Sequence, residues 1–128
     1  MIRKEEEMKF SFDNERPIYI QLVEKLRIAI VSGKYPPGSR LPSVRDLAME
    51  AKVNPNTMQK ALTELEDEKL IYTERTNGKF VTDNNVLIEK TKKELAKDIV
   101  NRYLKDMNNI GISNKESSKY LQELGGNK

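Results

Sequence analysis

The 128-residue sequence contains no cysteine and no histidine. These absences exclude disulfide bonds, thiolate chemistry, structural zinc sites and histidine general bases, which removes most enzyme templates. The sequence has no run of about 20 apolar residues, and residues 1–10 carry acids where a signal peptide needs an apolar core. We therefore expect a soluble cytoplasmic protein with no membrane segment, no catalytic activity and no cofactor. Its length permits one modest core with an appended helical piece.

The net charge of +3 is too small to indicate nucleic-acid binding by itself, so the distribution of charge matters. Basic residues outnumber acidic ones between Lys34 and Lys60, whereas residues 64–74 are rich in aspartate and glutamate. A helix that enters a major groove by its N-terminal end keeps such acids away from the phosphates. The simpler alternative is that acids and bases alternate on solvated faces.

Residues 41–70 predict two short helices joined by a tight turn. Ser43 is suited to cap the first helix, with Asp46 as its partner in a capping box. Asn54 followed by Pro55 is a second start signal, because asparagine is a preferred N-cap and proline is tolerated at the first helical position. This arrangement is typical of a helix-turn-helix.

The second of these helices is expected to run to about Lys69 and to be amphipathic. Its apolar side recurs at three- and four-residue spacing and comprises Met58, Ala61, Leu62 and Leu65. The opposite, solvated side comprises Asn56, Gln59, Lys60 and Thr63. Polar side chains on one exposed face indicate a recognition helix.

A supporting helix is expected before this motif. It begins at Pro17 and ends at Gly33, with one apolar stripe formed by Ile18, Leu22, Leu26 and Ile30. Residues 36–38 predict a turn and residues 39–41 an extended segment. Residues 1–15 predict a mobile lead-in, in which the alternating residues 9–12 form either a short strand or an apolar strap.

A β-hairpin is expected after the recognition helix. Residues 70–73 and 79–82 are rich in strand-forming types, and Asn77-Gly78 predicts a two-residue turn between them. The predicted tip carries small or basic residues that can approach a phosphate backbone or a minor groove, namely Arg75, Thr76, Asn77, Gly78 and Lys79. A hairpin without DNA-binding function uses the same turn, so its position directly after a helix-turn-helix is what indicates a wing.

The C-terminal part predicts two helices. The first spans about 86–107, with an apolar face of Ile88, Leu95, Ile99, Val100, Tyr103, Leu104 and Met107. The second begins at a capping box of Ser113 with Glu116 and carries Tyr120, Leu121 and Leu124. A second copy of the chain is the favoured partner for these faces, and packing back onto the helix that begins at Pro17 is the alternative.

Several motifs together resemble one known family. They are PIYIQL at 17–22, GKYPPGSRLPSVRDLA at 33–48, VNPNT at 53–57, ELE at 64–66 and GKFV at 78–81. They closely resemble the N-terminal DNA-binding domain of GntR-family bacterial transcription regulators, over roughly residues 10–82. The VNPNT form and the short C-terminal region are similar to the YtrA subfamily, in which two helices replace a large effector domain.

The resemblance implies an α+β chain, mainly helical with a small hairpin. It comprises a winged helix-turn-helix DNA-binding domain at 10–82 and a two-helix dimerisation region at 83–128. Its implied function is that of a homodimeric repressor of an inverted-repeat operator in double-stranded DNA, often beside ABC transporter genes. A winged-helix module for protein interaction is the alternative.

The resemblance also implies contacts at particular positions. The counterpart of Arg45 holds a phosphate or a guanine, and Asn54, Asn56 and Thr57 fall where the family's recognition helix touches phosphates and bases. Pro55 and Gln59 stand where better known members have arginines, so a guanine contact is expected to be lost, and adenine becomes a suitable partner for the Gln59 carboxamide. The counterpart of Gly78 lies close to the minor groove.

Two sets of residues are predicted to form the functional surfaces. The DNA-binding set is Lys34, Arg40, Ser43, Arg45, Asn54, Asn56, Thr57, Gln59, Lys60, Arg75, Asn77, Gly78 and Lys79. The dimerisation set is Leu95, Ile99, Val100, Tyr103, Leu104, Met107, Tyr120 and Leu121. No small-molecule effector can be named, although a cleft between protomers lined by Tyr103, Met107 and Tyr120 is an alternative use of those side chains.

Overall fold

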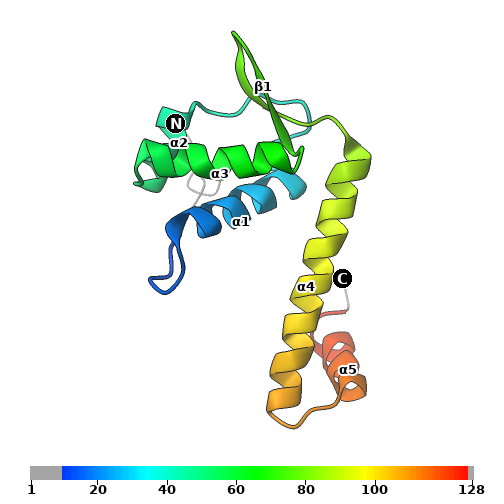
Figure 1. Cartoon of the computed structure of the whole chain (residues 1–128). Coiled ribbons are helices and arrows are strands. Elements are labelled where there is room, and N and C mark those ends of the chain that lie inside the picture. The colour runs from blue at the N-terminus through cyan, green and yellow to red at the C-terminus, as the bar shows by residue number, and fades with distance from the viewer. Residues whose placement is uncertain (1–9, 127–128) are drawn as a thin grey trace. The chain divides into compact units, whose positions relative to one another are not determined.

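The computed structural model describes residues 10–126 of the chain. These residues form five helices and one two-stranded hairpin (Figure 1). In chain order they are α1 (Ile18–Val31), α2 (Val44–Ala51), α3 (Pro55–Asp67), β1 (Ile71–Glu74), β2 (Gly78–Val81), α4 (Asn85–Asn109) and α5 (Asn114–Leu124). The predicted α+β class, mainly helical with a small hairpin, is confirmed.

The chain divides into two compact units that meet between Glu89 and Lys90, inside α4. The boundary predicted from the sequence lies earlier, at 82–83. The difference has a physical cause, because Ile88 is buried and Leu87 packs against the core of the first unit. The first turn of α4 is thus part of the winged unit.

The core of the first unit lies where α1 and α2 pack on α3. From α1 it takes Leu22, Leu26 and Ile30, as the apolar stripe predicted. Ile18 was wrongly included in that stripe, since its side chain is 37% exposed at the first turn of α1. A helix stripe predicts burial only where another element covers it.

Both predicted caps of the helix-turn-helix are present. The Ser43 hydroxyl accepts a hydrogen bond from the Asp46 N–H at 3.1 Å, and the Asn54 side chain accepts one from the Asn56 N–H at 2.7 Å. Each cap thereby satisfies one of the N–H donors that have no acceptor within the helix. The caps place the start of α2 and of α3 where the sequence predicts them.

Both helices end at a lysine in the left-handed region. Lys52 after α2 has φ of 58° and Lys69 after α3 has φ of 68°. Two backbone hydrogen bonds close the last turn of each helix. The one that spans more residues runs from the Val53 N–H to the Ala48 carbonyl in α2 and from the Leu70 N–H to the Leu65 carbonyl in α3. This is a Schellman motif with lysine where glycine is usual, and it ends α3 at Asp67 rather than at Lys69.

The hairpin pairs Ile71 with Val81 and Glu74 with Gly78, so three residues, 75–77, form the loop. The two-residue turn predicted at Asn77-Gly78 was therefore wrong. The Asn77 N–H donates to the Glu74 carbonyl at 3.2 Å, and Gly78 follows with φ of 98°. A β-turn followed by a left-handed glycine is the usual three-residue hairpin connection.

Residues 39–41 extend the hairpin on its other edge. The Leu41 N–H donates to the Lys79 carbonyl at 2.8 Å, and the Val81 N–H donates to the Ser39 carbonyl at 2.9 Å. The extended conformation predicted for this segment is confirmed. It holds Arg40 beside the wing, paired with Phe80.

The lead-in before α1 is described from Phe10, so Lys9 of the predicted alternating segment lies outside the described residues. Residues 10–12 form no strand, whereas Phe10 and Phe12 pack against the core, as the strap alternative predicts. The buried Gln21 side chain fixes this segment, since it accepts from the Asp13 N–H and donates to the Asp13 carbonyl, both at 2.8 Å.

The second unit consists of the rest of α4, a turn and α5. The predicted cap at Ser113 is present, because the Ser113 hydroxyl accepts from the Glu116 N–H at 3.2 Å; the Glu116 carboxylate accepts from the same hydroxyl at 3.4 Å. The Tyr103 hydroxyl donates to the Ser117 carbonyl at 2.7 Å and joins the two helices. No helix within residues 10–126 is long and apolar enough to cross a membrane.

Candidate nucleic-acid interface

The N-terminal half of α3 presents polar groups to solvent. Asn56 and Gln59 are exposed, and Thr57 is half-buried. Asn54 is exposed but its side-chain oxygen is occupied by the cap, so its carboxamide is held at the start of the helix. Four of the predicted DNA-binding residues thus lie together where the positive end of the helix dipole is directed outward.

The Gln59 side chain lies along the helix rather than across it. Its carboxamide nitrogen donates to the Thr63 hydroxyl at 3.3 Å, and that hydroxyl donates to the Gln59 carbonyl at 3.0 Å. A carboxamide held this way retains its oxygen and one N–H for an outside partner. Thr63 therefore fixes the direction of the Gln59 carboxamide.

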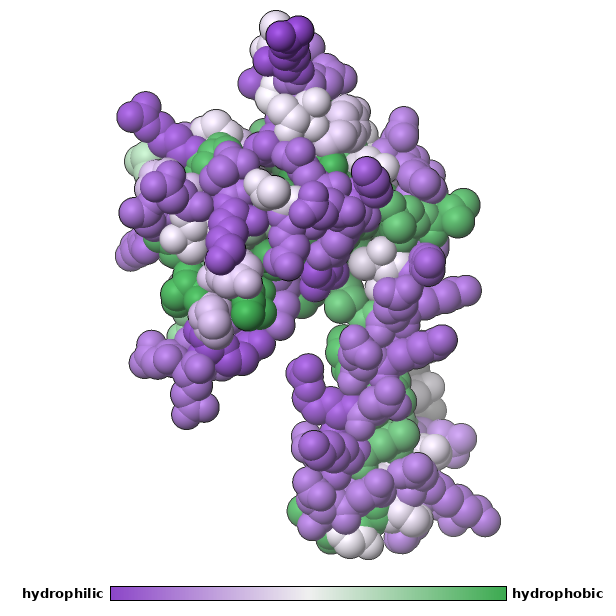
Figure 2. All heavy atoms as spheres, in the orientation of Figure 1, coloured by the Kyte–Doolittle hydropathy of each residue, from purple (hydrophilic) through white to green (hydrophobic). Residues whose placement is uncertain are grey.

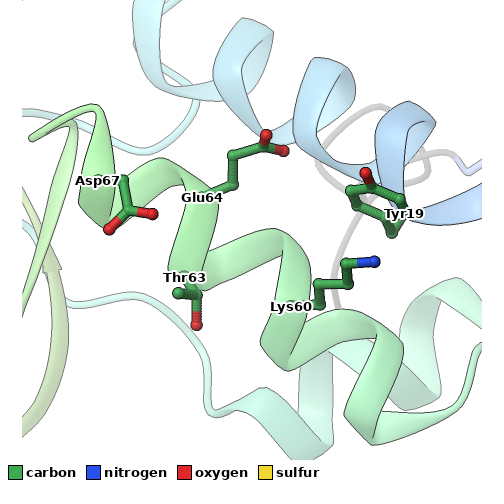
Figure 3. Close-up of a pocket in the computed structure, with 5 residues that line it drawn as sticks. All are labelled: Tyr19, Lys60, Thr63, Glu64 and Asp67. Atoms are coloured by element: carbon green, nitrogen blue, oxygen red, sulfur yellow. The ribbon is translucent and has the colours of Figure 1, made fainter.

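Lys60 lies toward α1 and not on the outermost line of α3. Its ammonium nitrogen is 3.8 Å from the centre of the Tyr19 ring, a cation–π contact (Figure 3). The two side chains line a shallow pocket of about 340 Å³ together with Thr63, Glu64 and Asp67. The sequence placed Lys60 on the solvated side, where it is exposed, but did not predict its contact with α1.

The acids in the C-terminal half of α3 are partly tied into the domain. Glu68 accepts hydrogen bonds from Arg27 of α1, one of them at 2.9 Å. The hydrogen bond to Glu68 raises the pKa of the Arg27 guanidinium, although burial opposes its charge. This half-exposed ion pair joins the helix end to α1 and neutralises one acid.

Glu66 makes the corresponding contact with the wing. It accepts hydrogen bonds from the Lys79 ammonium at 2.5 Å and from the Thr73 hydroxyl at 2.7 Å. Burial of Glu66 disfavours its charge, but these hydrogen bonds outweigh that effect and lower the pKa of the carboxyl. Lys79 also donates to Thr73 at 2.9 Å, so this wing lysine is engaged within the domain rather than at the tip.

The tip of the wing carries Arg75 and Asn77, both exposed. The Asn77 carboxamide donates to Glu74 at 3.0 Å, which holds it across the loop. Gly78 follows and lies against the Arg40 side chain, since an added Cβ there would come within 3.3 Å of the guanidinium. Glycine is favoured here by its positive φ, and the absence of a Cβ leaves room for the Arg40 guanidinium.

The remaining predicted contacts come from α2 and from the turn after α1. Arg45 is exposed in the first turn of α2, and Ser43, which caps that helix, is also exposed. Lys34 is exposed just after α1. The structure thus gathers the α2 and α3 residues in one motif, and gathers Arg40 with the wing residues in another.

The predicted dimerisation residues all lie in the second unit. Four are half-buried, namely Leu95, Tyr103, Leu104 and Met107. The other four are exposed, namely Ile99, Val100, Tyr120 and Leu121. Figure 2 shows apolar surface among the charged side chains of these helices.

Three residues that sequence reasoning missed support the interface. The Tyr19 ring makes a cation–π contact with Lys60, and Glu66 and Thr73 accept hydrogen bonds from Lys79. The pairing of Thr73 with Lys79 follows directly from a three-residue loop, because the two residues then stand opposite each other. The contact with Tyr19 leaves no signal of this kind in the sequence. Among residues 10–126, no group of acidic residues is placed to hold a metal ion.

Comparison with known proteins agrees with this geometry. Residues 18–81 match the family described as "Bacterial regulatory proteins, gntR family". The HTH-type transcriptional repressor YtrA of Bacillus subtilis is 33% identical over 110 residues, which cover 84% of each chain. The family match covers half of the chain, and the identity to YtrA extends over most of both chains.

Solved structures lead to the same family. A GntR family transcriptional regulator from Listeria monocytogenes superposes with a TM-score of 0.81 at 36% identity, covering 88% of this chain and 99% of that one. The DNA-binding domain of AraR, solved in complex with operator ORX1, gives a TM-score of 0.55 at 26% identity over 59% of this chain and 98% of that one. The winged helix-turn-helix described above is therefore a DNA-binding domain, and this chain belongs to the GntR family of bacterial transcriptional regulators.

Proposed function

We propose that the chain is a homodimeric repressor that binds an inverted-repeat operator in double-stranded DNA. The observation that carries this proposal is the division of α3. Its N-terminal half exposes Asn56 and Gln59, whereas Glu66 in its C-terminal half and Glu68 at its C-cap are paired with cations of the same domain. A helix with this polarity enters a major groove by its N-terminal end.

Base reading is assigned to the outer side chains of α3. Asn56 and Gln59 carry carboxamides, and a carboxamide pairs with the N6 and N7 positions of adenine. Thr57 follows Asn56 on the other side from Gln59 and is suited to a phosphate or a thymine methyl group. We expect an operator half-site with adenine or thymine at the central positions.

Anchoring to the backbone is assigned to cations around α3. Arg45 lies at the start of α2, Lys34 follows α1, and Arg40 and Arg75 belong to the wing region. Phosphate contacts fix the register of a protein on the duplex without reading sequence. The other proposed contacts are Ser43, Asn54, Lys60, Asn77, Gly78 and Lys79.

DNA binding is assigned to residues 10–82 and dimerisation to residues 83–128, of which the first turn of α4 packs against the winged core and residues 90–126 belong to the second unit. The second unit has one buried residue within 90–126, Ser117, whereas Ile99 is 61% exposed. Apolar side chains left open in this way favour a second copy as partner, because a symmetric dimer also supplies the second recognition helix that an inverted repeat needs.

Repression is supported by the relative from Bacillus subtilis, which is named a transcriptional repressor. A dimer seated on an operator blocks other proteins from the same DNA, so no catalytic step is required. The resemblance to the YtrA subfamily points to ABC transporter genes as targets.

Footprinting on the DNA that flanks the protein's own gene tests the proposal. We expect one protected region with two symmetric half-sites and an affinity that falls steeply with salt. Arg45→Ala should weaken binding about tenfold or more and lower the salt slope by about one. Lys97→Ala, which removes an exposed cation of the second unit outside the assigned contacts, serves as control. Two results would overturn the proposal: a footprint that is lost when excess unrelated DNA is added, or a protected region without two symmetric half-sites.

A further inference from the structure

Lys60 is held by an aromatic ring of a different helix. The ammonium stands 3.8 Å from the centre of the Tyr19 ring, and Tyr19 is half-buried and packed against the domain core. Figure 3 shows the lysine of α3 reaching across to the tyrosine of α1. Because the ring is fixed by the core, it defines where the ammonium lies in the free protein.

This position is on a flank of α3. An α-helix with its side chains is about 10–12 Å across, and the major groove is about 12 Å wide. A helix that fills the groove turns its outermost side chains to the base edges and its flanks to the two phosphate backbones. Asn56 stands on the outermost side, whereas Lys60 is drawn away from it toward α1.

The other groups around Lys60 limit what it can bind. Glu64 and Asp67 line the same pocket toward the C-terminal end of α3, and both are exposed. Their charges repel a phosphate from that end. A phosphate oxygen can therefore approach only from the N-terminal side, where the ammonium is solvated above the ring and retains its N–H donors.

We propose that Tyr19 is a positioning residue for Lys60, which holds the lysine ammonium on the α1-facing flank of the recognition helix to bind a phosphate rather than a base edge. The inference rests on the proposed DNA-binding function and refines the role of one contact in it. The aromatic ring covers one side of the ammonium only, so the N–H donors on its other side can bind a phosphate while the cation–π contact is kept.

The test uses the full chain on the operator found by footprinting. Four variants are compared with the parent: Lys60→Ala, Tyr19→Phe, Tyr19→Leu and the double variant Tyr19→Leu with Lys60→Ala. Affinity is measured at several salt concentrations and on operators with single base-pair changes. We expect Lys60→Ala to lower the salt slope by about one and to weaken binding equally on all operators. Tyr19→Phe keeps the ring and should match the parent.

The double variant isolates the coupling between the two residues. We expect Tyr19→Leu to weaken binding about twofold to fivefold, and Lys60→Ala to cost less in that background than alone, which a double-mutant cycle detects. Free-protein NMR provides a second readout, since the ring should shift the Lys60 methylene protons upfield in the parent and in Tyr19→Phe but not in Tyr19→Leu. The NMR comparison also reports whether each variant is folded.

Two results would overturn the inference. One is a Lys60→Ala protein with an unchanged salt slope and a relaxed preference at one base pair, because Lys60 would then be a base reader. The other is strict additivity of Tyr19→Leu and Lys60→Ala in folded proteins. If the parent itself shows no specific operator binding, the proposed function fails and this inference fails with it, whereas specific parental binding with additive variants rejects the inference alone.

Discussion

Leu62 and Leu124 are the same side chain in two different settings. Leu62 in α3 is fully buried, whereas Leu124 in α5 is 83% exposed. The contrast extends to whole units, because α1, α2 and α3 of the first unit enclose a continuous core and the second unit buries only Ser117 among residues 90–126. Similar apolar spacing along the sequence thus leads to a self-sufficient core in one unit and to an open face in the other.

This difference between the units supports the proposed assignment of the partner surface to the second unit. The winged unit completes its own core, so its exposed polar residues are available for DNA. In the helical unit the hydrogen bond between Tyr103 and Ser117 joins α4 to α5, but Ser117 is the one buried residue among residues 90–126. Burial of its open apolar side chains by a second copy would stabilise the dimer in proportion to the apolar area removed from water.

The largest expected effect comes from truncating the core leucine. Leu62→Ala should lower the free energy of unfolding by roughly 2–5 kcal/mol, because it leaves a cavity among packed side chains. Leu124→Ala should change it by less than about 0.5 kcal/mol at concentrations where the chain is monomeric. Urea denaturation of the two variants measures both values. Equal losses would remove the distinction between the units.

A charge placed on the open face should separate the protomers. Ile99→Asp is expected to reduce the mass in solution from two chains to one and to weaken operator binding more than tenfold, because a buried unpaired carboxylate is costly. Asn101→Asp adds the same charge two residues later, on the opposite side of α4, and should leave both properties unchanged. Light scattering measures the mass. An intact Ile99→Asp dimer would place the interface elsewhere.

The two serine caps allow the same substitution in each unit. Ser43→Ala should lower the free energy of unfolding of the winged unit by about 1 kcal/mol, since the Asp46 N–H loses its acceptor. Ser113→Ala should fray α5 without shifting that transition, because few contacts couple it to a core. Amide hydrogen exchange in the absence of DNA resolves the two helices. A shift of the main transition by Ser113→Ala would show that the units unfold together.

The smallest expected effect concerns the acid that holds Lys79. Because the pKa of Glu66 in the folded protein is lowered from 4.5, its contribution to stability is present above that pH and is lost as the pH falls through the folded value. Glu66→Gln should therefore destabilise the winged unit by less than about 1 kcal/mol near neutral pH. The difference from the parent should vanish in acid. Asp67→Asn is the control, and a difference independent of pH would contradict the assigned role.

Much of the first unit could be predicted because its signals are local. The caps at Ser43 and Asn54 and the apolar side of α3 depend on neighbouring residues only, and all were found where the sequence placed them. The ends of α2 and α3 were harder, because lysine occupies the left-handed position where glycine is the usual signal.

Contacts between distant segments could not be predicted. The exposure of Ile18, the cation–π contact of Tyr19 with Lys60 and the ion pair of Glu66 with Lys79 all depend on how helices and hairpin pack. Apolar spacing states which side chains share a face and does not state what covers it. The assigned DNA contacts and the dimer face remain predictions for the same reason.

The number of chains bound per operator tests most directly whether the protein binds DNA as a dimer. Sedimentation of the full chain with the footprinted duplex is compared with the same duplex after one half-site is scrambled. We predict a complex of two 14.8 kDa chains on the intact operator and a large loss of affinity once one half-site is scrambled. One chain per duplex, with equal affinity for both DNAs, would contradict the account.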